Sequence, residues 1–597
     1  MTQTHWSKDP RELTRYLNRL EEQHSQRLAL DRLILRQYYG RGGTTQVAQA
    51  VQASSSQNIL KAVESVRQGG FSLIRAAIDT AVSLVARMPA VKCQPTGETF
   101  SVRRRTKLQT RFLNGVMYAV DLKKRAHQAF IDGCTARVGA LLFYVDNEDT
   151  IRCERVNPLD LFWDETEDSV SPRNLARVHA VPRMQLAARF PDHAQAISSL
   201  PRYSPTSNPG VNLWSQDDGD RVKVVEGWCL PLGKDKGAHV VQSGDLTLAR
   251  EDYPFERHCV ATYRWGTSFD SFGGKPLGEI LIPYQLWTNR IVRMIDEGLK
   301  NCIPRLMVHE NAEVEGYTTT SMEKILWAGQ IPPTVQMGEG LSSDLVAWRD
   351  TLQREAFNEA GVNIAAVAGV KPAGLTSAVA LREYQDIANS RLIAPTAAFD
   401  AFITDCAKII LMLAETTYVK EPARVRAPGT KQLDEIEWKA GQLKESEYSV
   451  EVQATSALPL TVSGRLDFVK ELLAEGLISR ETGTRLLQLP DVEAELDRLN
   501  APRDLAEKQV EMALWEGKYA PMNPYQDPNL VLEIGTAEYM KADLNGTFPP
   551  ENMEILRRLI ANAQSMVKAP APASVAIPPP PSDVPQSDGQ LTTTAVS

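Results

Sequence analysis

Apolar side chains recur at helical spacing over most of the chain, and at strand spacing over shorter stretches. Leucines 13, 17, 20, 28 and 35 predict one helix over 9–39, and a further predicted helix over 58–88 stops at Pro89. Two more helices follow before the period changes. The runs ALLFYVD and TIRCERV then predict two strands around a turn that contains Asn147.

The middle of the chain changes from strands to long helices. Residues 170–275 mix short strands with turns, and RVKVVEGWCLPL alternates as a half-buried strand does. From residue 277 helical spacing dominates. One stripe, with steps of four and three, is expected to face a neighbouring helix and consists of Ile280, Tyr284, Trp287, Ile291 and Met294. A second helix over 342–361 has Leu345, Trp348, Leu352 and Ala356 on one side.

The pattern after residue 376 predicts a long helix from Ser377 to about Thr416, which Pro395 should kink. One more strand is expected over 447–456. A helical cluster follows, in which Gly476 caps one helix and Pro490 begins another. From residue 561 the chain becomes rich in proline and poor in aromatic residues, which predicts a disordered tail.

Between the two long helical stretches lies a segment, 362–376, that is unlike an ordinary linker. It consists of small apolar residues with Gly369, Pro372, Gly374 and one cation, Lys371. Connections of this length in a compact domain are commonly functional or disordered. This one is too apolar to be typical of disorder, so it is a candidate functional loop.

Composition narrows the class of protein. The 597 residues are 43% apolar and 23% charged, with a net charge of −8, which argues against a surface that grips nucleic acid throughout. This length suggests about three or four domains. The seven cysteines form no CxxC pair, which favours a reducing cytoplasm without disulfides or a zinc site. Residues 1–20 have no long apolar run, so we expect no signal peptide. We expect no membrane span either, because the apolar stretch 72–91 contains Arg75, Asp79 and Arg87.

The motifs that most suggest chemistry fail on inspection. SFGGKP lacks the first glycine of a phosphate loop, where Phe269 stands, and Lys275 is followed by Pro276 instead of Ser or Thr. HENAE begins like a zinc-protease helix at His309, but Glu313 occupies the position of the second histidine. We therefore expect no catalytic residues, no metal and no cofactor, and hence not an enzyme.

The order of these elements resembles the portal proteins of tailed bacteriophages, over roughly residues 10–520. The stretches that carry the resemblance are SLIRAAIDTAVSLVARMPAV at 72–91, FIDGCTARVGALLFYVD at 130–146, RVNPLDLFWDETEDSVSPRNLARVH at 155–179, the run 263–299 and the run 463–493. Each is weak alone, and their order is the specific feature. The resemblance implies a mixed α/β, helix-rich portal fold with wing, stem, clip and crown.

The resemblance also implies how the chain is divided. The wing would comprise 1–275 and 377–456, and its second part would contain the kinked long helix and a return strand. The stem helices would be 276–301 and 342–361, and the clip would be 302–341. The tunnel loop would be 362–376, the crown with C-terminal helices 457–560 and the tail 561–597. On this assignment Tyr284, Trp287, Ile291, Trp348 and Leu352 belong to stem packing, and Arg305 and His309 to the clip.

The implied function is a ring, usually of twelve subunits, at one capsid vertex of the virion, made in the host cytoplasm. It would conduct double-stranded DNA without sequence specificity during packaging and ejection. Its partners would be the terminase large subunit, the major capsid protein, the scaffold protein and the neck or tail adaptors. No contact with a membrane is expected. The alternatives are another head–tail adaptor or minor capsid protein, or a nucleic-acid-processing ATPase.

The loop composition suits a constriction around moving DNA. Small apolar residues make no base-specific hydrogen bonds. The loop would flex at Gly361, Gly369 and Gly374. Lys371 would contact the DNA phosphates transiently. The alternative is a loop packed between helices with Lys371 reaching solvent. Residues 276–361 hold seven Lys/Arg against twelve Asp/Glu, a net −5, which suits a wall that repels phosphate or one that pairs with neighbouring subunits.

The clip sequence contains the short β-prone runs IPRLMVHE and IPPTVQM. Such a pair would be marginal alone. Exchange of strands between adjacent subunits would cover their edges, and an intrachain hairpin is the alternative.

Overall fold

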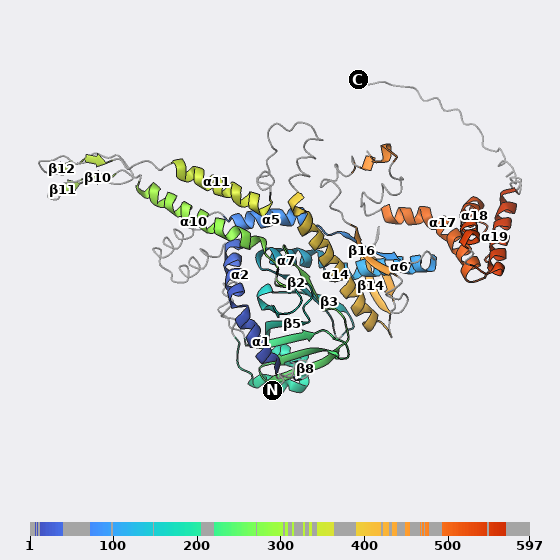
Figure 1. Cartoon of the computed structure of the whole chain (residues 1–597), viewed down its shortest axis with the longest axis horizontal. Coiled ribbons are helices and arrows are strands. Elements are labelled where there is room, and N and C mark those ends of the chain that lie inside the picture. Colours follow the sequence, from blue (N-terminus) through green and yellow to red (C-terminus); the bar gives the residue numbers. More distant parts are fainter. Residues whose placement is uncertain are drawn as a thin grey trace, which may run out of the picture. The chain divides into compact units, whose positions relative to one another are not determined.

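The computed structural model of the chain describes most of the predicted helices and strands. The described residues are 6, 9, 12–39, 72–96, 100–146, 148–203, 220–269, 271–301, 305–307, 313–315, 326–328, 334–336, 343–362, 390–419, 422–428, 433–438, 448–453, 466, 469–470, 472–476, 492–545 and 548–568. They form a mixed α/β, helix-rich structure, as the sequence predicts (Figure 1). The chain divides into two compact units, one of residues 1–98 and 102–490, the other of 491–597 with Thr99–Ser101.

The first helical stretch is two helices instead of the single one predicted over 9–39. They are α1 (Glu12–Gln23) and α2 (Ser25–Tyr38), and the break is at His24. The side chain of His24 is buried at 1% exposure, with Nε2 at 2.7 Å from the carbonyl oxygen of Trp163. A buried polar group needs such a partner, and this bond holds the break in place.

Three further helices and a long one enclose the main core of the larger unit. They are α5 (Leu73–Val85), α6 (Phe100–Ala119), α7 (Leu122–Thr135) and α14 (Ile393–Thr417). The rings of Phe130 and Tyr263 stack at 4.8 Å, and Phe399 of α14 meets both edge-on. The apolar face of α14 thereby buries large side chains against a sheet, and this burial is the main source of stability.

A three-stranded antiparallel sheet supports α7 and α14. Its order is β3 (Ile151–Val156), β2 (Gly139–Val145), β9 (Val260–Tyr263), so the predicted hairpin of ALLFYVD and TIRCERV is confirmed. Gly139 begins β2 where it meets α7. A Cβ there would lie 1.7 Å from the carbonyl oxygen of Ala129, so only glycine allows this approach.

A second sheet has five antiparallel strands, in the order β4 (Leu161–Trp163), β5 (Asn174–Pro182), β6 (Arg221–Cys229), β7 (Gly237–Ser243), β8 (Leu246–Tyr253). The predicted strand RVKVVEGWCLPL is β6. One face packs on α1 through Leu13, Leu17 and Leu20. The other packs on the short helices α8 (Arg183–Arg189) and α9 (Ala194–Ser199). Single-turn 3-10 helices at Pro158–Asp160 and Pro191–His193 precede β4 and α9.

Two smaller sheets complete the larger unit. β1 (Ala90–Pro95) pairs with β16 (Tyr448–Gln453), which confirms the strand predicted over 447–456. β14 (Ala423–Pro428) pairs with β15 (Leu433–Trp438), a hairpin that the sequence pattern did not reveal. Trp438 of β15 stacks on Phe112 of α6 at 4.5 Å, so the hairpin is attached to the main core.

The predicted kinked helix differs from the observed one. A 3-10 turn, η3 (Ser390–Leu392), leads into α14, and Pro395 lies in the first turn of that helix. A proline there costs no hydrogen bond, because the first amides of a helix have no intrahelical partner. Within the described residues the α-helix thus begins at Ile393, and a kink at Pro395 in a helix that continues from Ser377 stays a prediction. The part predicted before residue 390 lies outside the described residues.

The smaller unit is a group of three helices, α17 (Val492–Trp515), α18 (Pro528–Asn545) and α19 (Pro550–Lys568), with a core that includes Val510, Val531 and Leu559. α19 continues to Lys568, so the tail boundary predicted at 561 falls inside a helix. Residues 569–597 lie outside the described residues.

In the larger unit, Gly476 has a φ of +71° and its backbone amide donates to the carbonyl oxygen of Leu473, as expected of a helix cap.

Candidate functional site

Two long helices from the middle of the chain lie side by side. They are α10 (Leu277–Asn301) and α11 (Ser343–Ala360), and their bounds agree closely with the helices predicted over 276–301 and 342–361 (Figure 1). The short strands β10 (Arg305–Met307), β11 (Glu313–Glu315), β12 (Leu326–Ala328) and β13 (Thr334–Gln336) lie between them in the sequence. The pair and the segments at its two ends form the candidate site.

The root of α10 is fixed to the first helices of the chain by a buried glutamine. The Gln285 side-chain oxygen accepts hydrogen bonds from the backbone amides of Leu73, at 2.7 Å, and Ile74, at 3.4 Å. These amides begin α5 and have no partner within their own helix. The Gln285 amide nitrogen donates to Asn289, which itself donates to Gln37. A polar residue on an apolar helix face thus joins α10 to α5 and α2.

A group of buried charges surrounds the start of α10. Arg137 lies 3.1 Å from Glu279 of α10 and 3.8 Å from the buried Asp31 of α2. Burial raises the pKa of Asp31 to about 6, while Arg27 and Arg137 act in the opposite direction. The guanidinium of Arg27 lies 4.2 Å from the Trp163 ring centre. These contacts give α10 a fixed direction relative to α2 and the second sheet.

The end of α11 is closed by a Schellman motif. Gly361 has a φ of +70°, its amide donates to Asn358, and the amide of Val362 donates to Phe357 at 3.0 Å. The side chains of Phe357 and Val362 are both buried, as the apolar contact of this motif requires. Gly361 was predicted as a point of flexion. It is instead a helix cap, because only a residue tolerant of positive φ completes these two bonds.

The chain leaves α11 at Val362 and re-enters the described residues at Ser390, close to the same turn. Arg391 donates a hydrogen bond to the carbonyl oxygen of Asn358. The Tyr284 hydroxyl donates to Glu359, and this bond raises the pKa of Tyr284. Gly369, Lys371, Pro372 and Gly374 lie between these ends, outside the described residues. Their predicted role in the loop stays a prediction, but both ends of the segment are attached to α11.

The stripe predicted on α10 is only partly buried within one chain. Ile291 is buried and Tyr284 is half-buried, whereas Trp287 and Met294 are exposed at 53% and 45%. The buried side of α10 is formed instead by Leu281, Gln285, Thr288 and Ile291. On α11, Leu352 is buried and Trp348 is 52% exposed. Packing of the two tryptophans with another molecule stays a prediction.

The strands between α10 and α11 pair within the chain. β10 pairs with β13, with Arg305 opposite Gln336, and β11 pairs with β12. The described strands therefore pair as the intrachain alternative expects, and exchange of strands with a neighbouring subunit stays a prediction. Each sheet has only two strands. Of the two clip residues predicted, Arg305 lies in β10 and His309 lies outside the described residues.

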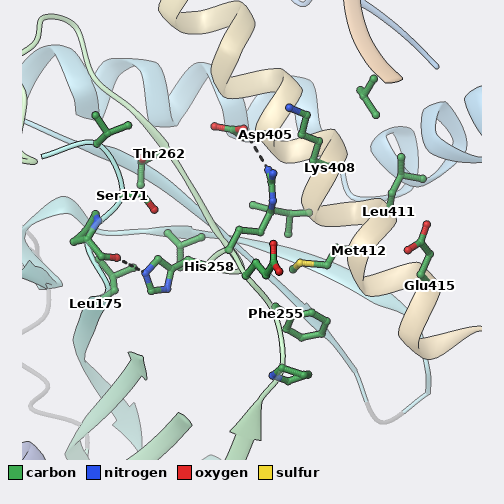
Figure 2. A pocket seen from close by; sticks show the side chains of 18 of the residues that line it. Ser171, Leu175, Phe255, His258, Thr262, Asp405, Lys408, Leu411, Met412 and Glu415 are labelled. Atoms are coloured by element: carbon green, nitrogen blue, oxygen red, sulfur yellow. Dashed lines mark hydrogen bonds and ion pairs between the residues drawn. The ribbon is translucent and has the colours of Figure 1, made fainter. Parts of the chain in front are cut away.

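A cleft that sequence reasoning missed lies between α14 and the loops around Pro172 and His258 (Figure 2). Its volume is about 780 Å³. Charged side chains line it, and Arg257 lies 3.7 Å from Asp405 of α14, with Lys408 one turn further along the helix. No sequence motif indicates this site, since its residues come from segments far apart in the chain.

Burial shifts the pKa of two titratable groups of the cleft, His258 and Asp405. Burial lowers the pKa of His258 to about 4, and Nε2 of this ring lies 2.8 Å from the carbonyl oxygen of Pro172. His258 is therefore neutral at pH 7, with Nε2 as the donor. Burial raises the pKa of Asp405, against the opposing effect of Arg257. These groups can bind a polar ligand by hydrogen bonds and ion pairs.

Neither a group of metal-binding side chains nor a membrane-spanning helix is present among the described residues. Within the described ranges, no three or more His, Cys, Asp or Glu side chains are grouped to hold a metal ion. In the same residues, no helix combines the length and apolarity needed to cross a membrane.

Comparison with known proteins adds no identification. No protein-family model matches the chain, and no curated protein matches it.

Proposed function

We propose that this chain is the subunit of a ring, a portal protein, through which double-stranded DNA enters and leaves a phage head. The observation that carries the proposal is the helix pair α10–α11, with short paired strands between the helices and an apolar loop that begins directly after α11. The order of elements in the sequence supports the same function. Terminase, neck or tail adaptors, scaffold and the major capsid protein would be the partners of the ring.

The anchoring of α10 and α11 supports a role as a rigid wall. Gln285 and the charges around Arg137 and Glu279 join α10 to the body of the unit. A conduit must keep its diameter while DNA moves through it, so helices that form its wall need such fixed roots. Each hydrogen bond that α10 makes to a charged side chain or to the first amides of α5 contributes about 1–3 kcal/mol to the stability of the fold.

The attachment of both ends of segment 363–389 supports a loop that keeps its place during transport. The Gly361 cap and the Arg391–Asn358 hydrogen bond hold the two ends at the last turn of α11. Within 362–376 the small apolar residues carry no groups that read bases, and Lys371 is the one cation of that stretch in each subunit. Twelve subunits would then present a ring of transient phosphate contacts.

The first test is electron microscopy with native mass spectrometry of the purified full-length chain. A closed ring with an axial hole wide enough for duplex DNA is the expected result. A compact monomer or dimer at all protein and salt concentrations would overturn the proposal. A ring without a continuous channel would favour another head–tail adaptor or minor capsid protein.

A second test concerns the DNA path. Lys371→Ala is expected to slow DNA packaging while leaving ring assembly unchanged, and Lys236→Ala, at an exposed position in the turn before β7, is the matched control. Equal packaging by both variants would remove Lys371 from the DNA path. ATP hydrolysis by the isolated protein would favour a packaging ATPase instead.

A further inference from the structure

Large apolar side chains are left uncovered on the helix pair within one chain. Leu286, Trp287 and Met294 of α10 and Trp348 of α11 are each about half exposed. Tryptophan and methionine are enriched in protein interfaces, and contiguous exposed apolar surface marks a site of association. Each helix of the pair therefore has exposed apolar side chains that suit a partner.

The exposed stripe of α10 is aromatic and basic. Trp287, Arg290 and Met294 are separated by steps of three and four residues, so they lie on one side of the helix. The Arg290 guanidinium lies 5.5 Å from the ring centre of Trp287. Between Pro283 and Met294 the helix has two arginines, Arg290 and Arg293, and no carboxylate.

The exposed stripe of α11 is aromatic and acidic. Trp348 and Glu355 are seven residues apart, which is about two turns, so they also share one side of their helix. Over Ser343–Ala360 the helix has four carboxylates against two arginines. Each stripe thus has an exposed tryptophan, with an arginine, Arg290, beside it on α10 and a carboxylate, Glu355, on α11.

We propose that neighbouring copies of the chain cover these side chains, with the Trp287–Arg290–Met294 stripe of α10 in one copy packed against the Trp348–Glu355 stripe of α11 in the next. This rests on the proposed function, since it names the contact through which the copies associate. A contact of α10 with α10 would bring Arg290 and Arg293 against their own copies. Such like-charge contacts are disfavoured, whereas the α10–α11 contact pairs arginine with carboxylate.

The charge pattern of α10 and α11 also favours a protein over a nucleic acid as the partner of their exposed stripes. Arg290 and Arg293 alone would suit phosphate, but the carboxylates of α11 lie on the adjacent helix and would repel it. The contact would bury Trp287 and Trp348 and would pair Glu355 with the arginines, so it would cover the exposed stripes of both helices. Each copy has both stripes, so a single kind of chain can satisfy the contact.

The test is sedimentation velocity and native mass spectrometry of the full-length chain and four variants. Arg290→Glu and Glu355→Arg are each expected to weaken self-association by roughly tenfold or more. The double variant Arg290→Glu/Glu355→Arg should associate again. An equimolar mixture of the two single variants should also form mixed assemblies, because each supplies the stripe that the other lacks. Lys234→Glu, a charge reversal at an exposed position in the turn between β6 and β7, is the control and should assemble like the wild type.

The outcomes separate this inference from the proposed function. If the wild type forms rings and both single variants form them equally well, the α10–α11 contact is wrong while the ring remains. If the single variants dissociate and neither the double variant nor the mixture recovers, the pairing is also wrong. If the wild type does not associate, both proposals fail. Circular dichroism establishes that the variants keep the wild-type helix content.

Discussion

The side-chain oxygen of Gln285 accepts a hydrogen bond of 2.7 Å from the backbone amide of Leu73, across more than two hundred residues of sequence. Gln285 is 1% exposed, in the middle of the buried side of α10. Its oxygen supplies the partner that the first amides of α5 lack, in addition to the cap by Ser72. The contact therefore joins the root of one proposed stem helix to the core of the unit.

Gln285→Leu should destabilise the larger unit by about 1–3 kcal/mol, because the amides of Leu73 and Ile74 would stay buried without an acceptor. Denaturant unfolding followed by circular dichroism measures this. Leu299→Ala, at an exposed position near the end of α10, is the control and should change the free energy of unfolding by less than about 1 kcal/mol. Equal effects of the two substitutions would show that the hydrogen bond contributes little.

Gly361→Ala should destabilise the end of α11 more than Gly233→Ala destabilises its own turn. Both glycines have positive φ, +70° and +60°, so alanine would be strained by about 1–2 kcal/mol at either position. At Gly361 a Cβ would also lie 3.1 Å from Cβ of Arg391, whereas at Gly233 it would meet no atom within 4 Å. Hydrogen exchange of the last amides of α11, compared with those around residue 233, measures the difference. Equal losses would mean that Arg391 yields without cost.

The sequence pattern was most informative where one element repeats a strong period. The bounds of α10 and α11, the β2–β3 hairpin and β16 could be predicted, because spacing of three and four or alternation is preserved through each of them. The break between α1 and α2 could not, since the leucine spacing continues across it. That break depends on the bond between His24 and the carbonyl of Trp163, a contact between residues far apart in sequence.

The side of α10 that is buried was also beyond the pattern. Apolar spacing placed Trp287 and Met294 on the packed side, whereas the structure buries Gln285 and Thr288 there. Polar residues can occupy a buried face when a helix end supplies their partners, as α5 does for Gln285. The cleft around Arg257 and Asp405 was missed for a related reason, because its walls come from separate segments.

Stability at acid pH should depend on His24. Burial, and to a lesser extent the charge of Arg27, lowers the pKa of this ring from 6.5 to about 4. A depressed histidine pKa leaves stability intact above pH 6.5 and removes it as the pH falls toward 4, because the unfolded state then binds more protons. The loss amounts to about 3 kcal/mol for this group.

His24→Gln keeps a donor for Trp163 and has no charge to acquire. Its free energy of unfolding should therefore fall less than that of the wild type between pH 7.5 and pH 5. Urea unfolding at the two pH values measures the difference in slope. The comparison between pH 8 and pH 9, where the ring is neutral in both the folded and the unfolded state, is the internal control. Parallel slopes over the acid range would contradict a neutral, buried His24.

The Asp132–Arg155 pair should respond unequally to removal of its two members. Nε and Nη2 of Arg155 donate to the two carboxylate oxygens of Asp132, each at 2.5 Å. The Asp132 side chain is 1% exposed and that of Arg155 is 38% exposed. Arg155→Ala would leave a buried carboxylate unpaired and should cost about 3–5 kcal/mol. Asp132→Ala leaves an arginine that can turn toward water, so it should cost less.

The acid dependence of Arg155→Ala distinguishes this explanation from simple loss of packing. Burial raises the pKa of Asp132, and Arg155 is the group that opposes this effect. Without Arg155 the folded state would take up a proton more readily than the unfolded state, so stability should be regained as the pH falls from 7 toward 4. Unfolding of Arg155→Ala and of Arg155→Ala/Asp132→Asn across this range measures it. The double variant should show a weaker dependence, and a deficit in Arg155→Ala that stays constant with pH would assign the loss to packing instead.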